Sequence, residues 1–148
     1  MKLKDSMAYM QSQSMRNNLI FGGLFESRYE RNEETEAKLR CFMHEKLQIA
    51  QDVVDTLKFE RVHRIGEQSD EGPRKIVCKF NMFPEREMVR KQRINLEGTP
   101  YFLHEQFPPE VNEKRRKLLP KMKDAKKDGK RAWLSYDSLY IDGKKVEL

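Results

Sequence analysis

The chain has 148 residues, of which 36% are charged and 37% hydrophobic, with a net charge of +6 and a mean hydropathy of −0.91. This length fits one ordinary domain or two small ones, and the clear periods of its apolar residues exclude full disorder. No apolar run approaches the roughly 18 residues that a membrane span needs, and the N-terminus lacks the apolar region of a secretory signal. Because Cys41 and Cys78 have no CxxC partner, we expect a reduced intracellular protein with two packed thiols rather than a disulfide or metal site.

Residues 1–15 have the rhythm of a coiled coil. A 4-3-4 spacing, typical of a and d positions, links Leu3, Met7, Met10 and Ser14. Two heptads do not distinguish the end of a longer coiled coil from a short leader helix, so both interpretations stay open.

Residues 17–106 read as alternating strands and helices. Apolar runs, period-2 alternation and turn residues predict strands over 18–21, 57–62, 75–80 and 101–104. An acidic first turn and an apolar stripe predict a helix over 33–49, and Pro84 begins a second helix that runs to about Ile94. The order β-α-β-β-α-β predicts a ferredoxin-like, RNA-recognition-motif-like domain over residues 16–106, within an α+β protein.

Residues 107–148 form a second, basic unit. Pro108 and Pro109 mark its start, and a helix is expected over 110–127, with Pro120 kinking or dividing it. Strands over 131–136, 139–141 and 145–148 follow, the last two joined by an Asp142–Gly143 hairpin turn. We therefore expect a small helix plus β-hairpin domain, docked onto the first because about 40 residues rarely fold alone.

The excess charge lies in this second unit. Residues 108–131 contain ten Lys or Arg and four Asp or Glu, a net charge of +6, while the rest of the chain has 20 of each and sums to zero. A charge excess confined to one segment points to a polyanion, most simply a nucleic-acid backbone.

The predicted sheet lacks the usual stacking residues. RNA-recognition motifs carry aromatics on their two central strands, where this chain has Ile20 on the first and Lys75, Val77 and Lys79 on the third. We expect weak base stacking and mainly phosphate contacts. A purely structural or protein-docking sheet remains an alternative, as does an interaction module that docks an acidic partner.

Basic side chains are the candidate nucleic-acid-binding residues. Arg115 is the sharpest of them, since it interrupts the apolar stripe of the C-terminal helix four residues after Val111. Solvated surface bases, with Arg115 snorkelling past its neighbours, are the plainer interpretation. The full candidate set is Arg16, Arg61, Arg64, Arg74, Lys75, Lys79, Arg90, Arg93, Arg115, Arg116, Lys123 and Lys127.

The sequence shows no catalytic apparatus. His44, His63 and His104 are scattered without ligands at metal-binding spacing, and neither a phosphate-binding loop nor a nucleophile elbow is present. We expect a protein that is not an enzyme and needs no metal or cofactor.

Five separated segments resemble a known family. SMRNNLIFGGLFE, ERVHRIGE, GPRKIVCKF, REMVRKQR and FPPEVNEKRRKLLPKMKDAKKDGKRAWLSYDSLYIDG are similar, in order, to the first-open-reading-frame protein of LINE (non-LTR) retrotransposons. The resemblance covers about residues 12–148. Host proteins derived from such elements share this architecture, so a domesticated copy fits equally well.

The resemblance implies more than the composition does. It implies a nucleic-acid chaperone that coats its transcript, binds single-stranded RNA or DNA between its two domains, and works in cytoplasmic ribonucleoprotein particles, with a nuclear location left open. It also implies a homotrimer through a longer N-terminal coiled coil, of which residues 1–15 would be the end; this chain itself is trimeric or monomeric. The family's basic residues map onto Arg64, Arg74, Arg90, Arg93, Arg115 and Arg116.

Overall fold

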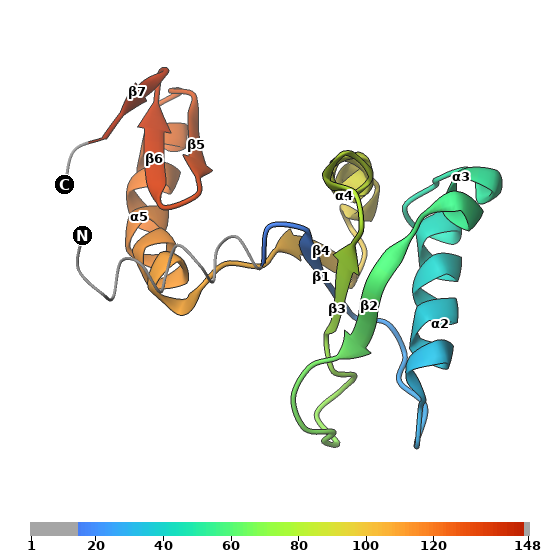
Figure 1. Cartoon of the computed structure of the whole chain (residues 1–148). Coiled ribbons are helices and arrows are strands. Elements are labelled where there is room, and N and C mark those ends of the chain that lie inside the picture. The colour runs from blue at the N-terminus through green and yellow to red at the C-terminus, as the bar shows by residue number, and fades with distance from the viewer. Residues whose placement is uncertain (1–14, 147–148) are drawn as a thin grey trace, which may run out of the picture. The chain divides into compact units, whose positions relative to one another are not determined.

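A computed structural model describes residues 15–146 of the chain (Figure 1). It is an α+β protein with antiparallel sheets, and it divides into two compact units: an N-terminal unit, Met15–Gln106, and a C-terminal unit, described here from Phe107 to Val146. Nearly all of the expected coiled-coil end, residues 1–15, lies outside the described residues. Every helix within residues 15–146 is too short or too polar to span a bilayer.

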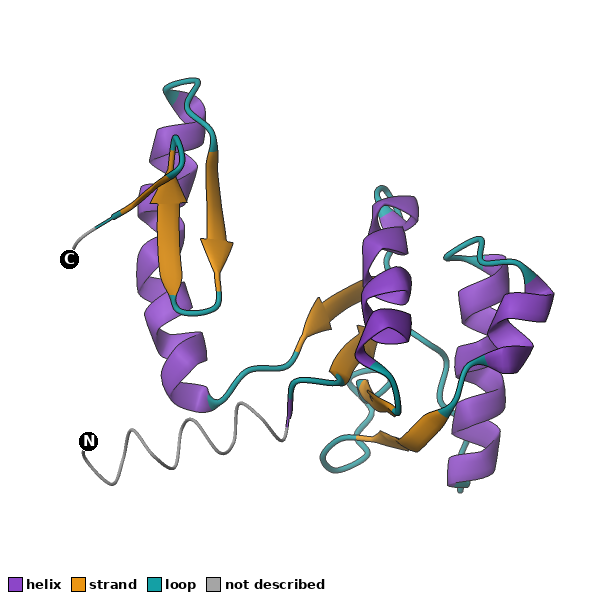
Figure 2. Cartoon of the chain, turned by 45° about the horizontal axis from the view of Figure 1, so that its top comes forward, coloured by secondary structure: helices purple, strands orange, loops and turns teal. Residues whose placement is uncertain are grey.

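Helices and strands are interspersed along the N-terminal unit (Figure 2). Its described residues form four strands, three α-helices and a short 3-10 helix. Its sheet has the order β2-β3-β1-β4, and every neighbouring pair is antiparallel. The elements are β1 (Asn18–Gly22), α2 (Asn32–Glu45), α3 (Gln51–Thr56), β2 (Phe59–Arg64), β3 (Ile76–Phe80), α4 (Phe83–Lys91), η1 (Gln92–Leu96) and β4 (Phe102–Glu105).

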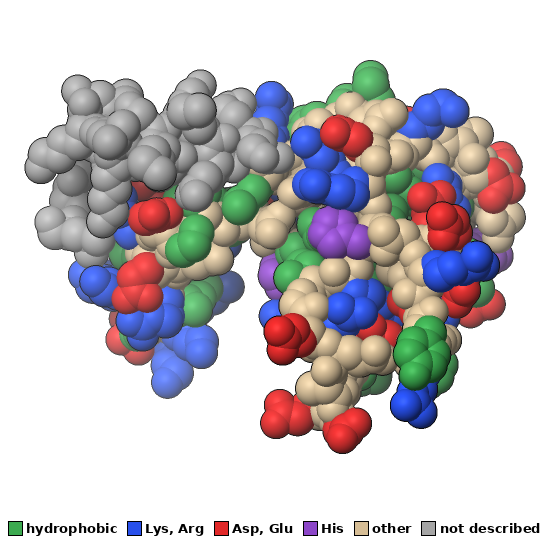
Figure 3. Space-filling view, turned by 60° about the horizontal axis from the view of Figure 1, so that its bottom comes forward, with side chains coloured by type: hydrophobic (Ala, Val, Ile, Leu, Met, Phe, Trp, Pro, Cys, Tyr) green, Lys and Arg blue, Asp and Glu red, His purple; other side chains and the backbone are tan. Residues whose placement is uncertain are grey.

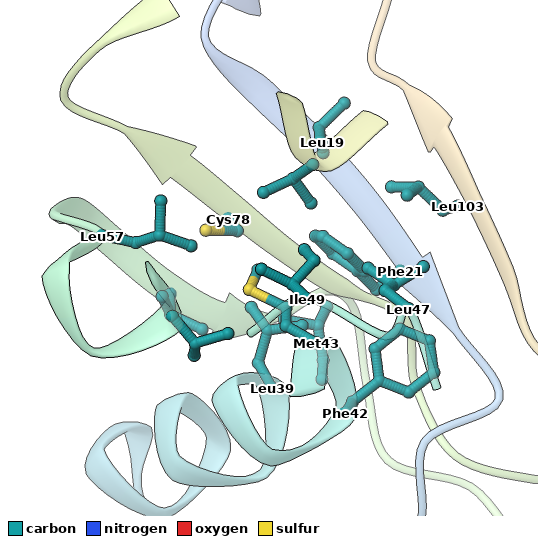
Figure 4. Close-up of a cluster of buried hydrophobic side chains, with 14 of the residues drawn as sticks. Leu19, Phe21, Leu39, Phe42, Met43, Leu47, Ile49, Leu57, Cys78 and Leu103 are labelled. Atoms are coloured by element: carbon teal, nitrogen blue, oxygen red, sulfur yellow. The ribbon is translucent and has the colours of Figure 1, made fainter. Parts of the chain in front are cut away.

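The helices of this unit pack on one face of the sheet. Side chains at alternate strand positions, such as Leu19 and Phe21 on β1, meet Leu39 and Met43 of α2 in a single buried cluster (Figure 4). The rings of Phe21 and Phe42 make an edge-to-face contact at 6.1 Å between centroids. Because strand residues alternate between faces, the intervening side chains lie on the opposite face, called here the outer face.

The first helix ends earlier than the apolar stripe predicts. The expected helix over 33–49 stops at Glu45, and the separate helix α3, which the sequence did not predict, follows it. Leu47 and Ile49 still enter the core, but Gln48 has a φ of 60°, which an α-helix does not allow. The stripe therefore identified the buried residues correctly and the helix end wrongly.

The C-terminal unit is one long helix against a small sheet. Helix α5 (Pro109–Lys127) packs against β5 (Ala132–Ser135) and β6 (Ser138–Ile141), followed by the short β7 (Lys144–Lys145). Its core contains Leu118, Ala125, Ala132 and Leu139. The turn between β6 and β7 is Asp142–Gly143, with φ of 52° and 84°, as the sequence predicted.

For this unit, one of the two alternatives for Pro120 is excluded, and the expected strand over 131–136 needs correction. Pro120 does not divide α5, which continues to Lys127; its missing N–H leaves the carbonyl of Arg116 unpaired within the helix, but Pro120 is exposed, so water can reach that region. Tyr136 is not in a strand. It has a φ of 54° and forms, with Asp137, the two-residue turn that joins β5 to β6.

Candidate nucleic-acid interface

The outer face of the N-terminal sheet combines a polar end and an aromatic end. On the central strand β1 it carries Asn18, Ile20 and Gly22, in that order. The register places β3 on one side of this row and β4 on the other. The outer face as a whole consists of Asn18, Ile20, Gly22, Arg61, His63, Val77, Lys79, Phe102 and His104, with Lys75 directly before β3.

Strand β4 supplies two aromatic rings that the sequence analysis missed. Phe102 pairs with Gly22 and His104 pairs with Ile20, so both side chains lie on the outer face. Their rings are parallel, with an interplanar angle of 1° and centroids 5.8 Å apart. Aromatic residues were expected only on the central strands, whereas the alternation from Tyr101 to His104 is the sequence signal that predicts this pair on the edge strand.

The ring of Phe102 occupies the space where a side chain at residue 22 would begin. A Cβ added to Gly22 would lie 1.9 Å from the Cζ of Phe102, far inside van der Waals contact. Glycine at this strand position therefore lets the ring lie close to the backbone of β1. Phe102 remains 40% exposed, and the ammonium of Lys75 lies 5.5 Å from its centroid.

Two of the predicted basic residues lie opposite each other on neighbouring strands of the outer face. Arg61 and Lys79 are register partners on β2 and β3; Arg61 is exposed, and Lys79 lies 3.5 Å from the carboxylate of Glu60. Next to them, partial burial and then the charge of Arg61 lower the pKa of His63, which favours its neutral form. Histidine side chains lie among Lys and Arg side chains on the face shown in Figure 3.

Arg90 and Arg93 line a groove that extends along β4. The groove encloses about 610 Å³ and is formed by the end of α4, by η1 and by the residues from Tyr101 to Leu103. Arg93 is exposed, whereas Arg90 donates two hydrogen bonds to Glu87, at 3.1 and 3.0 Å. Phe102 lines this groove as well, so basic and aromatic side chains meet there.

Arg64 and Arg74 belong to a different environment. The side chain of Arg64 is 3% exposed and hydrogen-bonds the carboxylate of Glu30 and the carbonyls of Leu24, Phe25 and Arg74. Arg74 pairs with Glu26, its Nη2 lying 2.6 Å from a carboxylate oxygen. Both arginines thus fix the chain that follows β1, and Arg64 is too buried in this arrangement to meet a phosphate.

Arg16 lies at the other end of the sheet. It is exposed, just before β1, and its guanidinium sits 4.3 Å from the ring centroid of Phe83 at the start of α4. Stacking on a ring leaves the donors at the edge of a guanidinium available to other acceptors. Arg16 is therefore held in place while exposed to solvent.

In the C-terminal unit, Arg115 has a structural role that explains its position in the apolar stripe. Its guanidinium lies 4.4 Å from the ring centroid of Phe107, and Nη1 donates to the carbonyl of Tyr136 at 2.6 Å. Phe107 and Tyr136 contact each other edge-to-face. Arg115 thus links the start of the unit to its β5–β6 turn. The helical pattern alone did not reveal these contacts with Phe107 and Tyr136.

The other predicted bases of α5 are exposed. Arg116 pairs with Glu113 one turn earlier, at 2.6 Å, and both side chains remain largely accessible. Lys123 and Lys127 are exposed nearer the C-terminal end of the helix. The buried face of α5 contains Val111, Leu118 and Ala125, and these basic side chains lie outside that face, exposed to solvent.

No family model matches the chain, and no curated protein is similar enough to it to count as a relative.

Within residues 15–146, no group of three or more His, Cys, Asp or Glu side chains could hold a metal ion. The described cysteines are both free: Cys78 is buried as expected, but Cys41 is exposed, which corrects the expectation that both thiols are packed.

Proposed function

We propose that this protein binds single-stranded RNA or DNA, mainly through phosphate contacts and with little sequence preference. The observation that carries the proposal is the charge of residues 108–131, which hold the whole net excess of +6. Along α5 this charge is exposed, at Arg116, Lys123 and Lys127. Confining like charges to one helix costs self-repulsion, which a bound polyanion relieves.

The architecture of the N-terminal unit supports the same proposal. Four antiparallel strands in the order β2-β3-β1-β4, with the helices on one face, are the arrangement expected of a ferredoxin-like, RNA-recognition-motif-like domain. Such domains bind single strands on the sheet face away from the helices. Here that face offers Lys75, Lys79 and Arg61 as bases.

Together with the resemblance of the sequence segments, these features favour a ribonucleoprotein component and nucleic-acid chaperone of a LINE-type element. Non-enzymatic coating of a transcript needs affinity for any sequence, which phosphate contacts supply. In this proposal a longer coiled coil brings three copies together, and each copy contributes its own bases.

The test is the affinity for a single-stranded oligonucleotide over a series of salt concentrations. Phosphate contacts release counterions, so log K should fall linearly with log salt, with a slope of roughly −0.7 for each phosphate contacted. A flat dependence would refute the proposal. A polyglutamate competitor that displaces the oligonucleotide at matched charge would favour the alternative, a module that docks an acidic protein.

A further inference from the structure

We propose that Phe102 and His104 form a stacking platform for a nucleobase on the outer face of the sheet. The inference rests on the proposed function and names the part of the single strand that this site takes. It assigns base contacts to the edge strand β4, in addition to the phosphate contacts of the basic residues.

The first argument is that the Phe102 ring is both exposed and fixed. It lies on the face away from the apolar core, so packing in the core is not the reason for an aromatic residue at this position. It also fills the space left by the missing Cβ of Gly22, which restrains the ring against the backbone. A ring that is already ordered loses little conformational entropy when a base stacks on it.

The second argument is the parallel orientation of the two rings. Phe102 and His104 lie two residues apart on β4, with their planes within 1° of each other and their centroids 5.8 Å apart. The two together present flat π surfaces in one orientation, which suits the stacked bases of a strand.

The third argument is that positive charge surrounds the platform. The ammonium of Lys75 lies 5.5 Å from the centroid of the Phe102 ring, and the groove that Phe102 also lines carries the exposed Lys91 and Arg93. In a single-stranded nucleic acid, each internal nucleoside has one phosphate on its 5′ side and one on its 3′ side. Lys and Arg side chains beside an aromatic ring therefore match both parts of a nucleotide, because the ring can stack on the nucleobase while the positive charges contact the phosphates.

A buried acceptor lies further along the same face. Asn18 occupies the same row of β1 as Gly22, is 4% exposed, and donates from Nδ2 to Gln106 at 2.8 Å. Its Oδ1 has no hydrogen-bond partner within the described residues. Leaving a buried carbonyl oxygen unpaired is costly, and an N–H group of a nucleobase, such as N3–H of thymine, is one donor that would satisfy it.

The experiment compares two single strands of equal length and charge, one carrying thymine bases and one abasic, by fluorescence anisotropy with the full chain. The variants are Phe102→Leu, which keeps the apolar bulk, and Phe102→Trp, which keeps a flat ring. Gly22→Ala is the third, because its methyl group displaces the ring while Phe102 stays in the sequence. Thermal unfolding of each variant checks that it folds.

We expect the wild type to prefer the base-bearing strand, and F102L to lose about 10-fold in affinity for it while its binding to the abasic strand and its salt slope stay unchanged. F102W should retain the preference, and G22A should lose it. If the wild type binds both strands equally and F102L changes neither, the platform is refuted while salt-dependent binding leaves the proposed function standing. If the wild type binds neither strand, the proposed function and the platform both fail.

Discussion

Arg64 and Glu30 form a buried, bidentate ion pair behind the first strand. Nε of Arg64 lies 2.8 Å from one carboxylate oxygen and Nη2 lies 3.3 Å from the other, and the two side chains are 3% and 1% exposed. Lys38 and Thr35 donate to the same carboxylate, at 2.5 and 2.6 Å. This network ties the chain after β1 to both α2 and β2.

The network makes stability depend on pH in the acid range. Burial on its own raises the pKa of Glu30, but hydrogen bonds from Arg64, Lys38, Thr35 and Ser27 outweigh it and hold that pKa well below its usual value. A carboxyl whose folded pKa is depressed contributes stability that is present above its unfolded pKa of about 4.3 and is lost as pH falls toward the folded pKa. Chemical denaturation from pH 7 to pH 2 should show this loss, and Glu30→Gln should abolish much of the pH dependence. A wild-type free energy of unfolding that stays constant below pH 4 would contradict it.

Arg64→Ala should destabilise the N-terminal unit strongly. Removing Arg64 breaks a buried ion pair, which typically costs about 3–5 kcal/mol, and leaves the Glu30 carboxylate with only Lys38 as a charged partner. Arg61→Ala is the matched control, because Arg61 lies on the same strand and is exposed, and it should change the free energy of unfolding by no more than about 0.5 kcal/mol. Urea denaturation of both variants measures the difference, and equal effects would show that the ion pair does not stabilise the fold.

Neighbouring arginines on α5 should separate binding from stability. Arg116→Gln removes an exposed charge, so it should weaken binding to single strands and reduce the salt slope by about 0.7 if Arg116 contacts one phosphate, with the melting temperature unchanged. Arg115→Ala should instead destabilise the C-terminal unit by about 1–3 kcal/mol, because it removes the bond to Tyr136 and the contact with Phe107. Binding isotherms and thermal melts of both variants test this, and a stable Arg115→Ala protein that has lost affinity would assign Arg115 to phosphate binding instead.

The two cysteines should differ in reactivity. Burial raises the pKa of the Cys78 thiol well above its usual value, while Cys41 is exposed, with its pKa raised by a hydrogen bond to Glu45. The thiolate is the reactive form, so a thiol reagent at pH 8 should modify Cys41 first and Cys78 only after denaturant is added. Mass spectrometry of the native protein should find one label, and two labels at comparable rates would show that β3 opens readily.

Periodic patterns predicted most of the secondary structure because they report burial. The alternation in β3 placed Ile76, Cys78 and Phe80 on one face, and that face is the core. The helix end at Glu45 was missed because the backbone turn at Gln48 leaves the apolar spacing intact.

The site was less predictable, because it depends on contacts between residues distant in sequence. Nothing in the sequence around Arg64 indicates that it pairs with the carboxylate of Glu30, which lies 34 residues earlier in the chain. The partnership of Phe102 with Gly22 likewise depends on the pairing of the first strand with the last. A basic residue can be counted in a sequence, but whether its charge is available to a ligand is decided by such tertiary partners.

The two compact units are joined covalently at Gln106–Phe107, and this link affects the affinity of the whole chain for a single-stranded nucleic acid. Each unit is proposed to hold only part of a single strand, and contacts of that kind are weak when each is made alone. A covalent link turns the second contact into an intramolecular event at an effective concentration that short connections raise to the millimolar range. If both units bind the nucleic acid as proposed, cutting the chain between these residues would lower the affinity without removing a single contacting group.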